Sequence, residues 1–89
     1  MSKAMLYEDE DFCVTGETID EHIYVHVSAY KYSKAIKIKM VSVWNDICEE
    51  VWLSGWDRIF SYNTNEKFAK LFGGKLVDKD LRMYVWELQ

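Results

Sequence analysis

The sequence contains no proline and only four glycines in 89 residues. Its turns must therefore rely on glycine, asparagine and aspartate. Lysine, glutamate and aspartate interrupt every apolar stretch. No run reaches the roughly 18 apolar residues that a membrane span needs. The first residues, Met1 to Met5, also lack the apolar core of a secretory signal peptide. No membrane association is expected.

Cysteine is scarce as well. Cys13 and Cys48 lie far apart in the chain and match no spacing of a metal site, so no metal ligand set is predicted. Cys48 falls in an apolar helical stripe, where a cysteine behaves as a small hydrophobic residue. These features favour the reducing cytoplasm.

Charge is distributed unevenly. Residues 1–21 carry seven acids against Lys3 alone, which gives −6, whereas the other 68 residues carry ten basic and eight acidic side chains, which gives +2. The net charge of −4 excludes bulk attraction to nucleic acid, although a local basic patch can still bind it.

Apolar residues are plentiful for so short a chain. Hydrophobic residues make up 49% of the sequence and aromatic residues 16%, well above a disordered composition. The length predicts a single domain over residues 1–89. Within it, the acidic segment 1–11 is expected to be disordered in part, with a weak strand signal at residues 5–7.

Two strands are predicted next, at residues 12–19 and 22–28, with a turn at Asp20-Glu21. From Ser33 the period becomes helical. Apolar residues predicted to face the core are Ile36, Met40, Val43, Trp44, Ile47 and Val51, with Val41, Cys48 and Trp52 widening the stripe. This predicts a helix of about five turns. Ser33 suits the N-cap and Gly55 the C-terminal stop.

The remaining residues predict a strand at 58–62, a short helix at 66–72 and a hairpin of 75–77 with 82–88. Asn63 with Glu66 three residues later is typical of a helix start. The predicted fold class is α/β, with a mixed sheet, the order β-β-α-β-α-β(β), one long helix and one short helix. Such crossovers place partly parallel strands in the centre of the sheet.

The segment 65–72, with the sequence NEKFAKLF, keeps an asparagine at the start, a leucine at the seventh place and an aromatic residue at the eighth. Gly73-Gly74 follows. With this motif and the element order, residues 22–88 resemble the C-terminal half of GNAT-type N-acetyltransferases, especially short phage-encoded members. The resemblance implies a minimal GNAT-like fold and acetyl-CoA as the cofactor of an active member.

The same resemblance identifies two departures. The pyrophosphate-binding loop of the family aligns with residues 31–36, where Lys34 replaces a glycine that lets the backbone approach phosphate. Phe72 stands where a tyrosine often protonates the departing CoA thiolate. Acetyl transfer is therefore expected to be lost or nearly lost, with no cofactor bound. An active enzyme would instead use the backbone of residues 27–30, the amides of residues 33–35 and Asn65.

Lysines gather at the start of the long helix, at positions 31, 34, 37 and 39, and acids lie at its end, at positions 49 and 50. The helix dipole favours the opposite arrangement. One interpretation is an anion site for CoA phosphates or a nucleic-acid backbone. The other is a solvated face whose lysines pair with the acidic N-terminal segment. The residues of the cofactor-binding or anion-binding site are Lys31, Ser33, Lys34, Ala35, Lys37 and Asn65.

Other polar and aromatic residues carry less information. His22 and His26 share one face of a strand but lie about 13 Å apart, too far for one metal ion. Trp44 and Trp52 are expected in the core and Trp56 at the surface. In an active enzyme, a tyrosine elsewhere would have to replace the general acid that is missing at Phe72. Three tyrosines are equal candidates for this role: Tyr30, Tyr32 and Tyr62.

The leading hypothesis is a GNAT-like, non-catalytic protein that binds another macromolecule, as an accessory or inhibitor protein, phage-encoded and directed at a host in the host cytoplasm. A protein partner is favoured. The alternatives are an acetyl-CoA-dependent N-acetyltransferase and an RNA-binding module that uses the lysine cluster. Homodimer formation is one way to cover an open sheet edge or an exposed apolar face.

Overall fold

The computed structural model describes residues 2–88 and confirms the α/β class, with a six-stranded mixed sheet and two helices. The elements are β1 (Ser2–Glu8), β2 (Phe12–Ile19), β3 (His22–Ala29), α1 (Lys34–Leu53), β4 (Arg58–Ser61), α2 (Glu66–Phe72), β5 (Lys75–Asp78) and β6 (Met83–Glu87). None of the helices in this part of the chain is long and apolar enough to cross a membrane.

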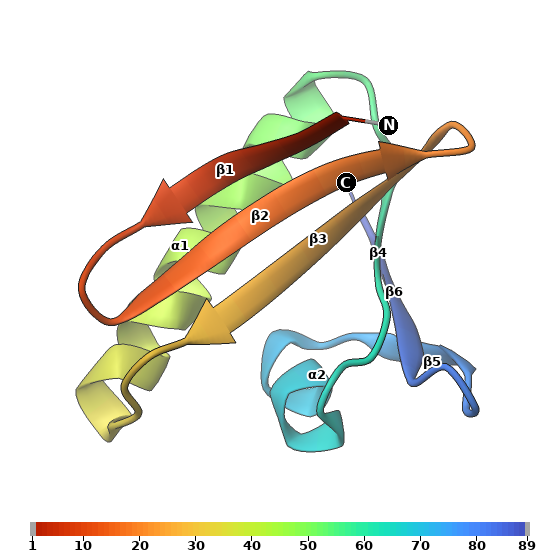
Figure 1. Ribbon diagram of the computed structural model, residues 1–89. Helices are drawn as coiled ribbons and strands as arrows, with labels where there is room; N and C mark the ends of the chain where they lie inside the picture. Colours follow the sequence, from red (N-terminus) through yellow and green to blue (C-terminus); the bar gives the residue numbers. More distant parts are fainter. Residues whose placement is uncertain (1, 89) are drawn as a thin grey trace.

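The strands lie in the order β1-β2-β3-β4-β6-β5 (Figure 1). Strands β3 and β4 are parallel, as the crossover through α1 requires, and the other neighbouring strands are antiparallel. The parallel contact is registered at one position, Tyr24 with Phe60. Beyond it the two strands diverge, which Figure 1 shows in the lower half of the molecule.

The N-terminal segment differs from expectation. Instead of being disordered in part, residues 2–8 form the full edge strand β1, which pairs with β2 from Ser2–Thr18 to Glu8–Cys13. The ring of Tyr7 stacks on Phe12 at 5.1 Å between centroids. Backbone pairing with β2 and this aromatic contact stabilise the strand despite its excess of acids. The alternation of residues along the segment does not reveal that pairing.

Both ends of α1 are as predicted. The hydroxyl of Ser33 accepts a hydrogen bond from the Ile36 amide at 3.2 Å, and this satisfies one free donor of the first turn. The helix ends at Leu53, and Gly55 follows in the left-handed region at φ 101°. The stripe that meets the sheet consists of Met40, Trp44, Ile47 and Val51, all buried.

Two tryptophan predictions are wrong. Trp52 is 45% exposed, because it lies on the flank of α1 and not on the narrower stripe that touches the sheet. Trp56 is half-buried and packs on the core. The turn at Gly55 brings Trp56 back, and its amide donates to the Val51 carbonyl at 3.2 Å.

The start of α2 is also corrected. Its N-cap is Asn65, whose side chain accepts from the Lys67 amide at 2.9 Å, whereas Asn63 lies two residues earlier with φ 55°. Asn63 tolerates that conformation because asparagine visits the left-handed region more readily than most residues. At the other end, a Cβ on Gly74 would stand 2.6 Å from the ring of Trp86, so only glycine fits there.

The core lies between the sheet and both helices. Trp44 of α1 meets Phe72 of α2 and Trp86 of β6, with ring centroids 5.2 and 4.9 Å away, so α1 and α2 cover the same face. Figure 1 shows α1 running behind β1 to β3. In the described part of the chain, residues 2–88, no helix covers the opposite face, which we call the uncovered sheet face.

Candidate functional site

Three of the residues predicted for the anion site, Ser33, Lys34 and Lys37, line one groove. The groove has a volume of about 520 Å³ and lies between the start of α1 and α2, with Ile38 and Leu71 as apolar walls. The Nζ of Lys37 stands over the ring of Tyr32, 5.1 Å from its centroid. The hydroxyl of Ser33 is engaged as the N-cap. The groove is thus basic at its rim and apolar inside.

The other predicted residues lie outside this groove. Ala35 is exposed on the first turn of α1, and Lys31 is exposed in the loop before it, where its amide donates to the Asp11 carbonyl at 3.1 Å. Asn65 lines a separate hollow, described next. The structure therefore divides the predicted site into two places.

The hollow that contains Asn65 lies where β3 and β4 diverge, and we call it the notch. It has a volume of about 210 Å³ and its walls include His26, Val27 and Phe68. The hydroxyls of Ser61 and Thr64 are hydrogen-bonded to each other at 2.7 Å, and the side-chain oxygens of Asn63 and Asn65 accept from Arg82 and from the Lys67 amide. Burial lowers the pKa of His26, and Lys3 adds to the effect, so the neutral imidazole is favoured.

None of the predicted acids lines the notch. The residues around it do not include Tyr30, Tyr32 or Tyr62. Phe72 packs its ring against Phe68, with centroids 4.2 Å apart, and its carbonyl accepts from the Trp86 indole at 2.9 Å. Among the described residues around the notch, His26 is the side chain able to exchange a proton near neutral pH.

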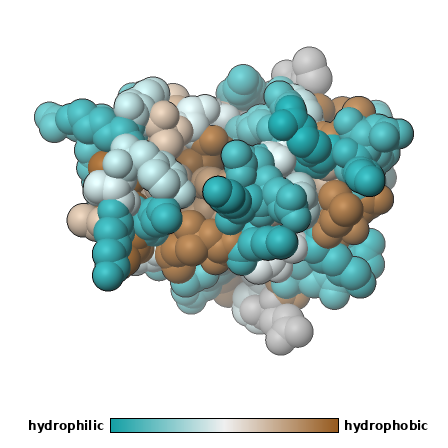
Figure 2. Space-filling model, turned by 90° about the horizontal axis from the view of Figure 1, so that it is seen from below, coloured by the Kyte–Doolittle hydropathy of each residue, from teal (hydrophilic) through white to brown (hydrophobic). Residues whose placement is uncertain are grey.

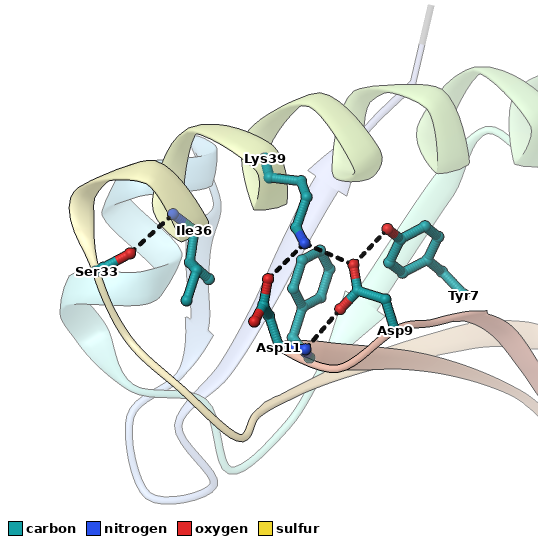
Figure 3. A network of polar contacts seen from close by, with 7 residues as sticks. Tyr7, Asp9, Asp11, Ser33, Ile36 and Lys39 are labelled. Atoms are coloured by element: carbon teal, nitrogen blue, oxygen red, sulfur yellow. Dashed lines mark hydrogen bonds and ion pairs between the residues drawn. The ribbon is translucent and has the colours of Figure 1, made fainter.

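The acidic N-terminal segment pairs with one lysine of the cluster, Lys39 (Figure 3). Its Nζ lies 2.7 Å from Asp9 and 2.6 Å from Asp11, and the hydroxyl of Tyr7 donates to Asp9 at 2.6 Å. These contacts hold the pKa of Asp9 well below its usual range, chiefly through Lys39. Within residues 2–88, Lys31, Lys34 and Lys37 form no ion pair.

The arrangement in Figure 3 has a structural role. Asp9 also accepts from the amides of Asp11 and Phe12, at 2.8 and 3.1 Å, and so closes the turn between β1 and β2. Lys39 reaches this turn from α1 and lies over the ring of Phe12. The network thus joins the β1–β2 turn to α1. Lys39 is used in this structural contact, unlike the three lysines at the start of α1.

The uncovered sheet face carries a feature that the sequence analysis missed. Five rings from β3, β4 and the residue directly after β4 alternate in one line, which we call the aromatic ladder. Successive ring centroids are 5.2, 5.7, 5.8 and 5.0 Å apart. In order along this line, the members are His22, Phe60, Tyr24, Tyr62 and His26. Edge-to-face and tilted pairs of this kind are favourable arrangements of aromatic rings.

Opposite charges lie on both sides of the ladder. Lys3 is opposite Glu17 across β1 and β2, and Arg58 is opposite Glu87 across β4 and β6. Lys3, Glu17, Tyr24 and Tyr62 together line a shallow hollow. The face is therefore aromatic in its centre and nearly balanced in charge at its margins, a composition closer to a protein interface than to a nucleic-acid site.

The signal for the ladder was present in the alternation of β3 and of residues 58–62. Val25 and Ile59 are buried, so their neighbours Tyr24, His26 and Phe60 had to point away from the core. What the sequence could not supply was the side of the sheet on which α2 packs. Only with α2 on the same side as α1 do these rings remain uncovered.

Comparisons of the chain with protein-family models, with curated proteins and with solved structures found no match.

Proposed function

We propose that this protein acts by binding a protein partner through the uncovered sheet face, without acyl transfer. The observation that carries the proposal is the aromatic ladder. Its rings combine a large apolar area with polar tips, and Tyr62 is 39% exposed. Tyrosine and other aromatic side chains of this kind dominate the energetics of protein interfaces.

The residues that align with the acyl-transfer and phosphate-binding residues of the resembling family support the same proposal. Phe72 offers no hydroxyl and is packed against Phe68. Lys34 begins α1 where a glycine would let the backbone approach phosphate. A GNAT-like ancestry remains part of the proposal, as does an accessory or inhibitory role for a phage-encoded protein in a host cell. Acetyl-CoA is not needed for such a role.

Site-specific photocrosslinking tests the proposal. A benzophenone amino acid at Tyr62 keeps an aromatic side chain in the ladder, and the same group at Lys79, exposed in the turn between β5 and β6, is the matched control. In the cell that makes the protein, we expect a discrete adduct with another protein from position 62 and none from position 79. No adduct at position 62, or the same adducts from both positions, contradicts the proposal.

A second candidate function is acetyl-CoA-dependent N-acetyl transfer, and one observation favours it. The notch lies at the divergence of β3 and β4 and is lined by Phe68 of α2, and the groove at the start of α1 is lined by Leu71, one turn further along the same helix. By resemblance, the acyl group would occupy the notch and the phosphates would bind near Ser33 and Lys34. His26 would then be the nearest general base.

Binding of RNA through Lys31, Lys34 and Lys37 is the third candidate. The three lysines form no ion pair within residues 2–88, which leaves their charge available. Against it stand the net charge of −4 and the apolar interior of the groove. Salt separates this candidate from the others, because binding to a phosphate backbone weakens steeply as the salt concentration rises.

A further inference from the structure

Strand β1 forms one free edge of the sheet, and Figure 1 shows it outermost, with α1 behind. Within residues 2–88 its backbone pairs with β2 alone, so its other side is unpaired along seven residues. A bulge between Met5 and Tyr7 interrupts the register with β2, and the residues on both sides of it remain paired. A free edge presents its outward N–H and C=O groups as a template for another strand. The edge of β1 is open to such pairing.

The opposite edge of the sheet, β5, offers a poorer template. It has four residues, and its register with β6 shifts between Leu76 and Asp78. Short edge strands of this kind discourage pairing with another chain. Strand β5 lies low in Figure 1, and the view from below in Figure 2 shows apolar patches separated by hydrophilic side chains. Strand β1 is therefore the longer of the two free edges.

A hollow lies beside β1, between the strand and α1, with a volume of about 220 Å³. Its walls are Leu6, Tyr7, Val43, Asp46, Ile47 and Glu50. The four residues of α1 among them recur at spacings of one to four, so they share one face of the helix. A strand added to β1 would lie about 4.8 Å from it and send every second side chain to the α1 side of the sheet. Those side chains would border the hollow.

The charge of this edge specifies the chemistry of the partner. Asp46 and Glu50 are exposed at the hollow, and neither forms an ion pair within residues 2–88. The same is true of Glu8 and Glu10, at the end of β1 and in the turn after it. A lysine or arginine side chain fits here, because its aliphatic stem can lie on Val43 while its charged head meets the carboxylates.

A second copy of this chain fits the edge poorly. Residues 1–21 carry a net charge of −6, which becomes −5 when Lys39, the ion-pair partner of Asp9 and Asp11, is added. Two copies joined along β1 would bring two such segments together. Like charges on adjacent strands destabilise their pairing. The complementary segment is therefore a basic one from a different protein.

We propose that β1 binds an extended, basic segment of another protein as a seventh strand of the sheet, with lysine or arginine side chains over the hollow beside α1. The other side chains of that segment lie next to Met5, which is 53% exposed and is opposite Thr15. Apolar residues fit there. This binding mode does not depend on the aromatic ladder, because the backbone of β1 makes the contact.

Amide exchange followed by NMR tests the added strand. The probe is a synthetic peptide as long as β1, with capped ends and alternating lysine and valine. At millimolar peptide we expect the outward amides of β1 to exchange about tenfold more slowly, with β5 unchanged. The same peptide methylated at two neighbouring central nitrogens keeps its charge but cannot pair on either edge, and should protect nothing. An unprotected β1, equal protection of β5, or equal protection by the methylated peptide overturns the proposal.

Paired variants test the role of the hollow. Asp46→Asn combined with Glu50→Gln removes both carboxylates and should weaken binding of the lysine–valine peptide roughly tenfold. Glu49→Gln combined with Glu87→Gln is the matched control, because it removes the same charge from a different hollow. We expect the control to bind the peptide within about twofold of the parent protein. No loss of affinity in the first variant, or an equal loss in both, overturns the proposal.

Discussion

The covered face of the sheet buries Phe12, Val14 and Val25 to 1% exposure or less, whereas the uncovered sheet face leaves Tyr62 39% exposed. Both faces come from the same strands, and alternate residues of β3 serve each of them. On the covered face the side chains are aliphatic or aromatic and meet the helices. On the uncovered face they are aromatic and polar-tipped, and they meet one another. Stability should therefore depend mainly on the covered face, whereas the partner binding proposed above uses the uncovered sheet face.

The largest expected effect is on the covered face. Met40 and Ile47 are 2% and 6% exposed on the buried stripe of α1. Met40→Ala and Ile47→Ala should each lower the free energy of unfolding by about 2–5 kcal/mol, from lost burial and the cavity that remains. Urea denaturation followed by tryptophan fluorescence measures this. Variants that unfold with the midpoint of the parent protein would show that α1 packs with a different face.

A smaller effect on stability is expected on the uncovered sheet face. Tyr62→Ser removes the ring contacts with Tyr24 and His26. The loss should be about 0.5–1.5 kcal/mol for each ring pair at most, because the site is partly open to solvent. Binding of the partner should fall much more than stability does. The comparison of the faces fails if Tyr62→Ser unfolds as readily as Met40→Ala.

The pH dependence of folding stability tests the uncovered sheet face further, because His26 lies at the end of the aromatic ladder. Its pKa is lowered in the folded protein, first by burial and then by Lys3, with Glu17 acting in the opposite sense. The unfolded chain therefore binds the proton more readily, and stability must fall as the pH drops through the ordinary histidine pKa of about 6.5.

We expect His26→Gln to remove this part of the pH dependence between pH 7.5 and 5.5, as measured by urea denaturation at each pH. Lys3→Gln should reduce it, since one cause of the lowered pKa is gone. Loss of stability through Asp9 belongs to a lower range, because its pKa is lowered from 3.8. A parent protein whose stability is constant over the range would refute the role given to His26.

The smallest expected effect is that of acetyl-CoA. We expect no rise in melting temperature at submillimolar acetyl-CoA, because Lys34 and Phe72 replace the residues that serve the cofactor in the resembling family. A ligand present at about 100 times its dissociation constant would add roughly 2.7 kcal/mol, which thermal unfolding detects readily. Clear stabilisation by acetyl-CoA would indicate that the functional site is the notch between β3 and β4 and not the uncovered sheet face.

Much of the fold could be predicted from local pattern. The alternation in β2 and β3 and the helical period of Met40, Trp44 and Ile47 fixed three elements, and Ser33 and Gly55 marked the ends of the long helix. Those signals depend on nearest neighbours along the chain. Strand β1 depends instead on pairing with β2, and its own residues give only a weak preference.

The candidate site could be predicted far less well. A period of 3.6 residues places Trp52 near the buried stripe, but it cannot say how wide a strip of the helix the sheet covers. Nor can it say that Asn65 and Lys34 line different hollows. The aromatic ladder needs knowledge of which strands are neighbours, since its rings come from two strands separated by all of α1.

The single registered contact between β3 and β4 has a consequence for how the molecule opens. Strands β2 and β3 are registered at eight positions and β4 and β6 at four, whereas the backbones of β3 and β4 are registered at Tyr24 and Phe60 alone. The sheet thus consists of two antiparallel ladders joined by a short seam. Native-state amide exchange should show them as two cooperative units, with the amides of β4 at the seam exchanging before those inside the β2–β3 ladder.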